Sequence, residues 1–172
     1  MKKLTWFALI IFSVLPSATA QQVHSMASLV ERIVREKEPS CTVVRRDVSG
    51  RNAEPSEDDT VSLYLKLKDQ EVYVGTSNQK TSEAAVAYYL ASTSTQITRS
   101  GYKLTPDGEK LKRLVDEADF FRNGSPVRIK WGHHLTFDVA FRKGKVVIIV
   151  ESRKPEIAQK IALDIAAELP PT

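Results

Sequence analysis

The stretch LTFDVAFRKGKVVIIV, residues 135–150, decides the fold class of this chain. Apolar and polar residues alternate in its first half, which is typical of a strand with one buried side. Lys143-Gly144 then marks a turn, and five aliphatic residues follow it, Val146 to Val150. A short run that is apolar on both sides predicts a central strand covered on both faces. The stretch therefore predicts a hairpin at the centre of a sheet.

Further strands and four helices are predicted around this hairpin. Residues 61–67 alternate in the same way, and Val72-Tyr73-Val74 returns after a short turn, which predicts a second hairpin. Two more strands are expected at residues 41–48 and 127–131. Apolar residues at helical spacing predict helices that begin near Ser25 or Ser28, Thr81 or Ser82, Thr105, and Pro155. These elements predict an α+β protein: an antiparallel sheet, or sheets, with helices packed on one face.

The third predicted helix has the clearest start signal. Thr105 is suited to cap it, with Pro106 at the first helical position, where a missing N–H costs nothing. Its apolar stripe continues through Val115 to Ala118. We therefore expect a helix from residue 106 to about residue 118.

The two halves of the chain, residues 24–97 and 105–169, both read as helix, three strands and helix. A shift of 135 − 61 = 74 residues places Val61 on Leu135, and the same shift places Thr81 on Pro155. A fixed period favours duplication, so the halves are candidate αβββα half-repeats of one compact domain. The general frequency of hairpin-then-helix units would explain the same register without duplication.

The N-terminus predicts a cleavable export signal. Lys2-Lys3 precede an apolar run from Leu4 to Leu15, and Ala18-Thr19-Ala20 provides the small-x-small pattern of a cleavage site. The run is about twelve residues long, short of the roughly 20 that span a bilayer. We therefore expect a signal peptide over residues 1–20, a single domain over residues 21–172 that does not span a membrane, and a periplasmic or secreted location.

Charge and cysteine content exclude some classes of function. The chain has 25 basic and 21 acidic residues, a net charge of +4, and loss of Lys2 and Lys3 would leave 23 − 21 = +2. So small an excess gives little reason to expect nucleic acid as a partner. Cys41 is the only cysteine, so it cannot form an intramolecular disulfide. It is expected to be a small buried residue, with a disulfide-linked dimer or a mixed disulfide as the alternative.

Catalytic motifs are absent, and one group of residues is left as a candidate. The chain lacks a G-x-S-x-G elbow, an H-E-x-x-H helix, a C-x-x-C pair, a P-loop and a dinucleotide-binding glycine pattern. His133 and His134 would point to opposite sides of a strand and would chelate one metal poorly, so neither a metal site nor a cofactor is expected. In a turn they could converge, with Asp138 orienting one of them.

Binding candidates lie on the predicted sheet. Arg128 and Lys130 could share one open face with Tyr64 and Tyr73, an arrangement that suits an anionic envelope component or a protein surface. A plain solvated sheet face is the alternative. The sequence thus favours an exported, non-catalytic binding or interaction module. Two alternatives stay open: a small exported hydrolase that uses His133 or His134 with Asp138, and a small-ligand carrier, which would require a cavity.

Overall fold

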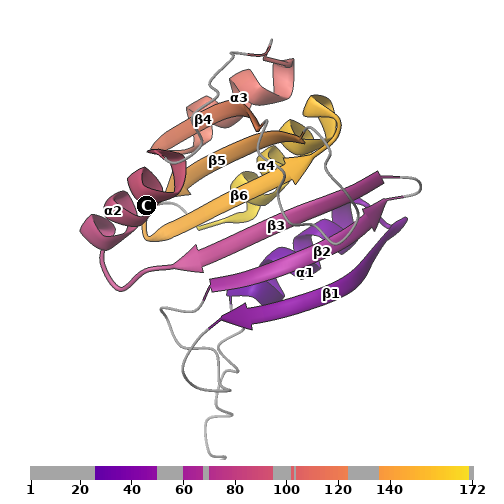
Figure 1. Cartoon of the computed structure of the whole chain (residues 1–172), viewed down its shortest axis with the longest axis horizontal. Helices are drawn as coiled ribbons and strands as arrows, with labels where there is room; N and C mark the ends of the chain where they lie inside the picture. Colours follow the sequence, from indigo (N-terminus) through magenta and orange to yellow (C-terminus); the bar gives the residue numbers. More distant parts are fainter. Residues whose placement is uncertain are drawn as a thin grey trace, which may run out of the picture.

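A six-stranded antiparallel sheet forms the centre of the computed structural model, which describes residues 26–49, 60–67, 70–94, 102, 104–123 and 136–170. The elements in chain order are α1 (Met26–Lys37), β1 (Cys41–Ser49), β2 (Thr60–Leu67), β3 (Gln70–Asn78), α2 (Ser82–Ser94), α3 (Pro106–Leu114), β4 (Glu117–Asn123), β5 (Thr136–Lys143), β6 (Val146–Ser152) and α4 (Pro155–Glu168). The strand order is β1-β2-β3-β6-β5-β4, as Figure 1 shows. The sheet thus consists of two three-stranded meanders joined edge to edge through β3 and β6.

The predicted fold class, α+β with an antiparallel sheet, is confirmed. β6 pairs with β3 on one side and with β5 on the other, so the aliphatic run is central as expected. Within the run Val147, Ile148 and Val150 are almost fully buried. β6 therefore contributes apolar side chains to both faces of the sheet.

The helices divide unequally between the two faces (Figure 1). We call the face that carries Leu63, Val74 and Ile148 the inner face; α1, α3 and α4 lie on that side, in one continuous aliphatic core. The opposite, outer face carries a smaller cluster, in which Tyr89 of α2 packs against strand residues such as Val147. Three helices therefore share one face, as predicted, and α2 lies on the other.

A buried hydrogen-bonded group joins α3 to α4 within the inner core. Oε1 of Gln159, in α4, accepts hydrogen bonds from the backbone N–H and the hydroxyl of Thr105, each at 2.8 Å. Oγ1 of Thr105 in turn accepts from the N–H of Gly108 at 3.3 Å, so Thr105 caps α3 as predicted, with Pro106 in the first turn. A Cβ atom on Gly108 would lie 2.1 Å from Oε1 of Gln159, so any larger residue here would displace the Gln159 amide.

The prediction of a helix through Ala118 was wrong, because α3 ends at Leu114 and a strand, β4, begins at Glu117. β4 pairs antiparallel with β5, with Phe120 opposite Val139. Residues 118–121 can satisfy either period: Ala118 extends the helical stripe, but it also alternates with Asp119. Pairing with β5 decides in favour of the strand, an example of tertiary context overriding local pattern. The predicted strand at 127–131 lies outside the described residues.

The half-repeat hypothesis is not confirmed. Both halves contain a three-stranded meander, and the two meet at the β3–β6 pair. However, α2 and α4, which would be equivalent in a duplicated unit, pack on opposite faces of the sheet. The strands therefore follow the proposed repeat and the helices do not.

The structure also bears on the predictions for Cys41 and for membrane-spanning segments. Cys41 is a free cysteine in the inner core with an exposed fraction of 5%, and burial raises the pKa of its thiol. Its side chain therefore packs in the core, and its thiol is a poor nucleophile in this structure. No helix in the described part of the chain is both long and apolar enough to cross a membrane.

Candidate functional site

Three of the predicted site residues lie in one row across the outer face of the sheet. Tyr64 of β2 is opposite Tyr73 of β3, Tyr73 is opposite Glu151 of β6, and Glu151 is opposite Asp138 of β5. We call these four residues the cross-strand row. Sequence analysis selected Asp138 and the two tyrosines separately, and the fold joins them through Glu151.

The tyrosine half of the row is held in a defined geometry. The rings of Tyr64 and Tyr73 meet edge to face, with centroids 5.3 Å apart at 63°. The hydroxyl of Tyr73 is hydrogen-bonded to the hydroxyl of Ser62 at 2.9 Å. The Tyr73 ring lies beside Gly75, where a Cβ atom would come within 3.0 Å of the phenol oxygen. Both tyrosines are half-buried, so these fixed rings still present surface to solvent.

The acidic half of the row is buried. Asp138 has no exposed surface and Glu151 exposes 8% of its own. Burial, and next to it the charge of Asp138, raises the pKa of Glu151 to about 8. Glu151 is therefore protonated at neutral pH. Its Oε2 atom is buried and makes no hydrogen bond with the residues that the structure describes.

Aromatic residues at the edge of the sheet fix the strand that carries Asp138. The hydroxyl of Tyr102 donates to the backbone carbonyl of Asp138 at 3.2 Å. The Tyr102 ring meets Phe137 edge to face, with centroids 5.2 Å apart, and also lies 6.4 Å from Phe120. Burial raises the pKa of the Tyr102 phenol, so it remains a hydrogen-bond donor over the physiological range. These contacts position Asp138 and leave its carboxylate on the outer face.

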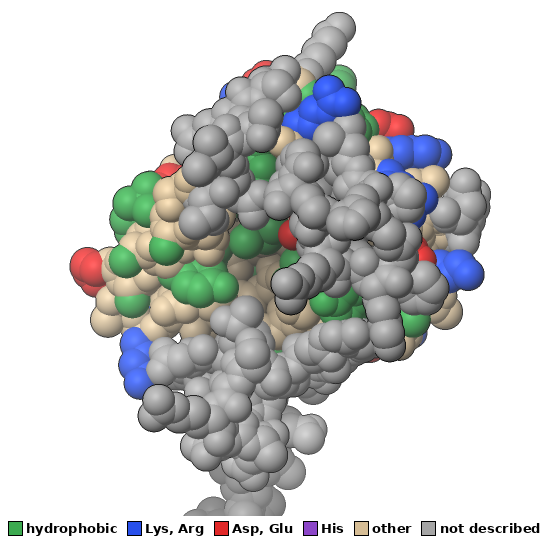
Figure 2. Space-filling view, viewed as in Figure 1, with side chains coloured by type: hydrophobic (Ala, Val, Ile, Leu, Met, Phe, Trp, Pro, Cys, Tyr) green, Lys and Arg blue, Asp and Glu red, His purple; other side chains and the backbone are tan. Residues whose placement is uncertain are grey.

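The remaining predicted residues, His133, His134, Arg128 and Lys130, lie outside the described residues, and their roles stay predictions. Within the described ranges no three His, Cys, Asp or Glu side chains gather as ligands for a metal ion. In Figure 2, viewed from the side of α2, the visible lysine and arginine side chains lie near the periphery. Hydrophobic and uncharged atoms fill most of the visible middle.

Sequence analysis missed Glu151, although a usable signal was present. Asp138 and Glu151 flank the turn at Gly144, where β5 and β6 are joined with Lys143 opposite Val146. Counting five residues outward from that pair along each strand brings Asp138 opposite Glu151. The turn length therefore fixes the pair once the hairpin is recognised.

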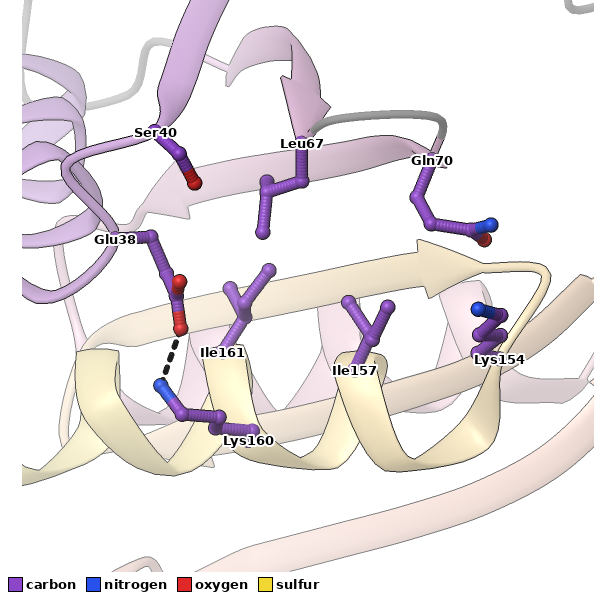
Figure 3. Close-up of a pocket in the computed structure, with 8 residues that line it drawn as sticks. All are labelled: Glu38, Ser40, Leu67, Gln70, Lys154, Ile157, Lys160 and Ile161. Atoms are coloured by element: carbon purple, nitrogen blue, oxygen red, sulfur yellow. Dashed lines mark hydrogen bonds and ion pairs between the residues drawn. The ribbon is translucent and has the colours of Figure 1, made fainter.

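A second feature of the described chain is a pocket of about 300 Å³ beside the start of α4. Figure 3 shows its lining: Glu38, Ser40, Leu67, Gln70, Lys154, Ile157, Lys160 and Ile161. Three aliphatic side chains lie between two polar ends. This is the kind of cavity that the ligand-carrier alternative requires.

Comparisons with known proteins identify no relative: no family model, no curated protein and no solved structure matches this chain.

Proposed function

We propose that this chain is an exported, non-catalytic binding module that contacts a protein partner through Tyr64 and Tyr73. The observation that carries the proposal is the half-buried, edge-to-face tyrosine pair on the outer face. Tyrosine is among the residues most enriched at the energetic centres of interfaces, since it buries a large ring and loses little conformational entropy. The Ser62 hydrogen bond and the close approach to Gly75 already restrict the Tyr73 ring, which lowers that entropic cost further.

The charges beside the tyrosine pair favour a protein over an anionic envelope component. In the register of the sheet Lys66 on β2 is paired with Glu71 on β3. On β1, Arg45 is paired with Tyr64 and Asp47 with Ser62, so the basic and acidic residues around the tyrosine pair are equal in number. Next in the row, Glu151 is neutral at pH 7 because burial raises its pKa to about 8. An aromatic surface with balanced charge is typical of the centre of a protein interface.

Site-specific photo-crosslinking in the producing cells tests this proposal. A benzoylphenylalanine at position 64 keeps an aromatic ring on the outer face, and the same residue at Arg113, exposed on α3, is the matched control. We expect a discrete protein adduct at position 64 that is absent at position 113 and is lost when Tyr73→Ser is added. Equal labelling at both positions, or no protein adduct at position 64, would contradict the proposal. A non-protein adduct at position 64 would replace the protein partner with an envelope component.

A hydrolase is the second candidate, and the complete burial of Asp138 favours it. In serine hydrolases a buried aspartate orients the catalytic histidine without touching the substrate. Under this alternative Asp138 would be a positioning residue for His133 or His134. The double variant His133→Ala/His134→Ala distinguishes the two functions. An enzyme would lose turnover of a probe such as p-nitrophenyl acetate and keep its stability, whereas a binding module would keep both its stability and its crosslink at position 64.

A further inference from the structure

We propose that the pocket beside the start of α4 binds a small aliphatic carboxylate. The site is formed by the residues that follow α1, by the adjoining ends of β2 and β3 at Leu67 and Gln70, and by the first two turns of α4, and it does not involve the tyrosine pair. It is therefore a second binding site, independent of the proposed protein interface.

The middle of the pocket is aliphatic. Leu67 of β2 lies on one side, and Ile157 and Ile161 of α4 point towards it from the other, as Figure 3 shows. Ile161 belongs to the inner core, and Leu67 and Ile157 pack against that core. The wall is thus rigid and apolar, and it suits a short hydrocarbon chain.

The two polar ends of the pocket differ in their free charge. At one end the ammonium group of Lys160 pairs with two carboxylates, those of Glu38 and, at 3.0 Å, of Asp164, so no positive charge is left there for a ligand. At the other end Lys154 is exposed, and its ammonium group makes no ion pair with a described residue. The charge available to a ligand is therefore positive and lies at the Lys154 end.

Two further groups at this end favour an anion. Lys154 is the N-cap residue of α4, and its side chain makes no capping hydrogen bond, so the positive end of the helix dipole adds to its charge. Gln70 lines the pocket and lies beside Lys154 in Figure 3, and its side-chain amide has N–H groups that can donate to a carboxylate.

The volume limits the size of the ligand. A cavity of about 300 Å³ holds on the order of ten waters at roughly 30 Å³ each. It therefore suits a ligand of about ten non-hydrogen atoms, at the small end of ligand pockets in general. Octanoate has this size, an aliphatic chain and one carboxylate, and so it is the probe of choice.

Titration of the purified protein with sodium octanoate, followed by amide chemical shifts in two-dimensional NMR, tests the site. Octan-1-ol and octylamine serve as probes with the same chain and a different head group. We expect saturable shifts at Ser40, Leu67, Gln70 and Ile157, with octanoate tighter than octanol and octylamine the weakest. Saturation elsewhere on the protein, or no preference for octanoate over octylamine, would overturn the proposal.

Three variants separate the contributions of charge and chain. Lys154→Ala is expected to weaken octanoate about tenfold and to leave octanol unchanged, because it removes only the cation. Ile157→Ala is expected to weaken both probes about fivefold through lost apolar contact. Lys145→Ala, which removes the same charge at the far end of β6, should change neither. Octanoate affinity that survives Lys154→Ala, or falls equally in Lys145→Ala, would show that no carboxylate site is present there.

Discussion

The inner and outer faces of the sheet are built from the same six strands but have different chemistry. The inner face supports a continuous core under three helices, in which buried side chains such as Leu63, Phe141 and Ile148 are aliphatic or aromatic. The outer face has one helix, α2, and a small cluster around Tyr89 and Val147. Beyond that cluster its central row is Tyr64, Tyr73, Glu151 and Asp138.

This difference indicates that the inner face mainly stabilises the fold and that the outer face carries the candidate functional residues. Apolar burial supplies most of the favourable free energy of folding, so the larger core on the inner face contributes more to stability than the small outer cluster. Burial of two neighbouring carboxyl groups costs free energy, and perturbed carboxyls of this kind cluster at functional sites. The buried carboxyl groups of the outer face therefore lower the stability of the fold, and their presence favours a functional role.

The largest expected effect comes from deleting a core side chain on the inner face. Ile148 and Ile149 are adjacent in β6, and their side chains point to opposite faces; Ile148 is fully buried and Ile149 partly exposed. Ile148→Ala should lower the free energy of unfolding by about 2–5 kcal/mol, as large-to-small core substitutions do. Ile149→Ala, between Gly75 and Ala140, should cost about 1 kcal/mol. Urea denaturation of the two variants measures the difference, and equal costs would refute the assignment of stability to one face.

The next effect is a dependence of stability on pH caused by Glu151. This carboxyl keeps its proton up to about pH 8 in the folded protein and ionises near its ordinary pKa of 4.5 when the chain unfolds. The unfolded state therefore loses the proton first as the pH rises. The free energy of unfolding should fall between about pH 4.5 and pH 8, by up to about 1.4 kcal/mol per pH unit, and level off above that range.

Glu151→Gln tests this origin, because an amide of the same shape cannot ionise. We expect the variant to lose most of the decline in stability between pH 5 and pH 8 in urea denaturation. Glu156→Gln, an exposed substitution in the first turn of α4, should keep the wild-type decline. A wild-type slope in Glu151→Gln would mean that another group is responsible.

Most of the fold could be predicted because apolar residues recur at regular strand or helix spacing along most of its elements. Alternation identified β2 and β5, the aliphatic run identified β6, and Thr105-Pro106 identified the start of α3. β4 was missed because residues 118–121 satisfy both the helical and the strand period, and only pairing with β5 chooses between them. The face that α2 covers could not be predicted either, since within this helix the large apolar Leu90 is exposed while the small Ala85 is buried.

The candidate site was harder to predict than the fold because it is a property of register across strands. Asp138 and the two tyrosines are far apart in the sequence, and only the β3–β6 pair brings them into one row. The Asp138–Glu151 contact follows from the tight turn at Gly144, so the sequence contained it. The pocket beside α4 had no sequence signal, since the turn after α1, the ends of β2 and β3, and α4 contribute to it from distant segments.

The smallest expected effect concerns the fixed position of the Tyr73 ring. In Gly75→Ala the new Cβ would lie 3.0 Å from the phenol oxygen and 3.2 Å from a ring carbon, so the ring must move. We expect a cost of about 1 kcal/mol, at the low end of overpacking, with loss of the Ser62 hydrogen bond. Urea denaturation measures the cost, and tyrosine fluorescence reports the change in ring environment.

A double-mutant cycle with Tyr73→Ala shows whether that cost comes from the ring. Without the ring, Gly75→Ala should be neutral or stabilising, because alanine reduces the entropy of the unfolded chain and no contact opposes it. A coupling close to zero would mean that the strand itself requires glycine at position 75, and that the Tyr73 ring is free to move. In that event the outer face would lack the preorganised tyrosine on which its proposed binding role depends, and the contrast between the two faces would be one of stability alone.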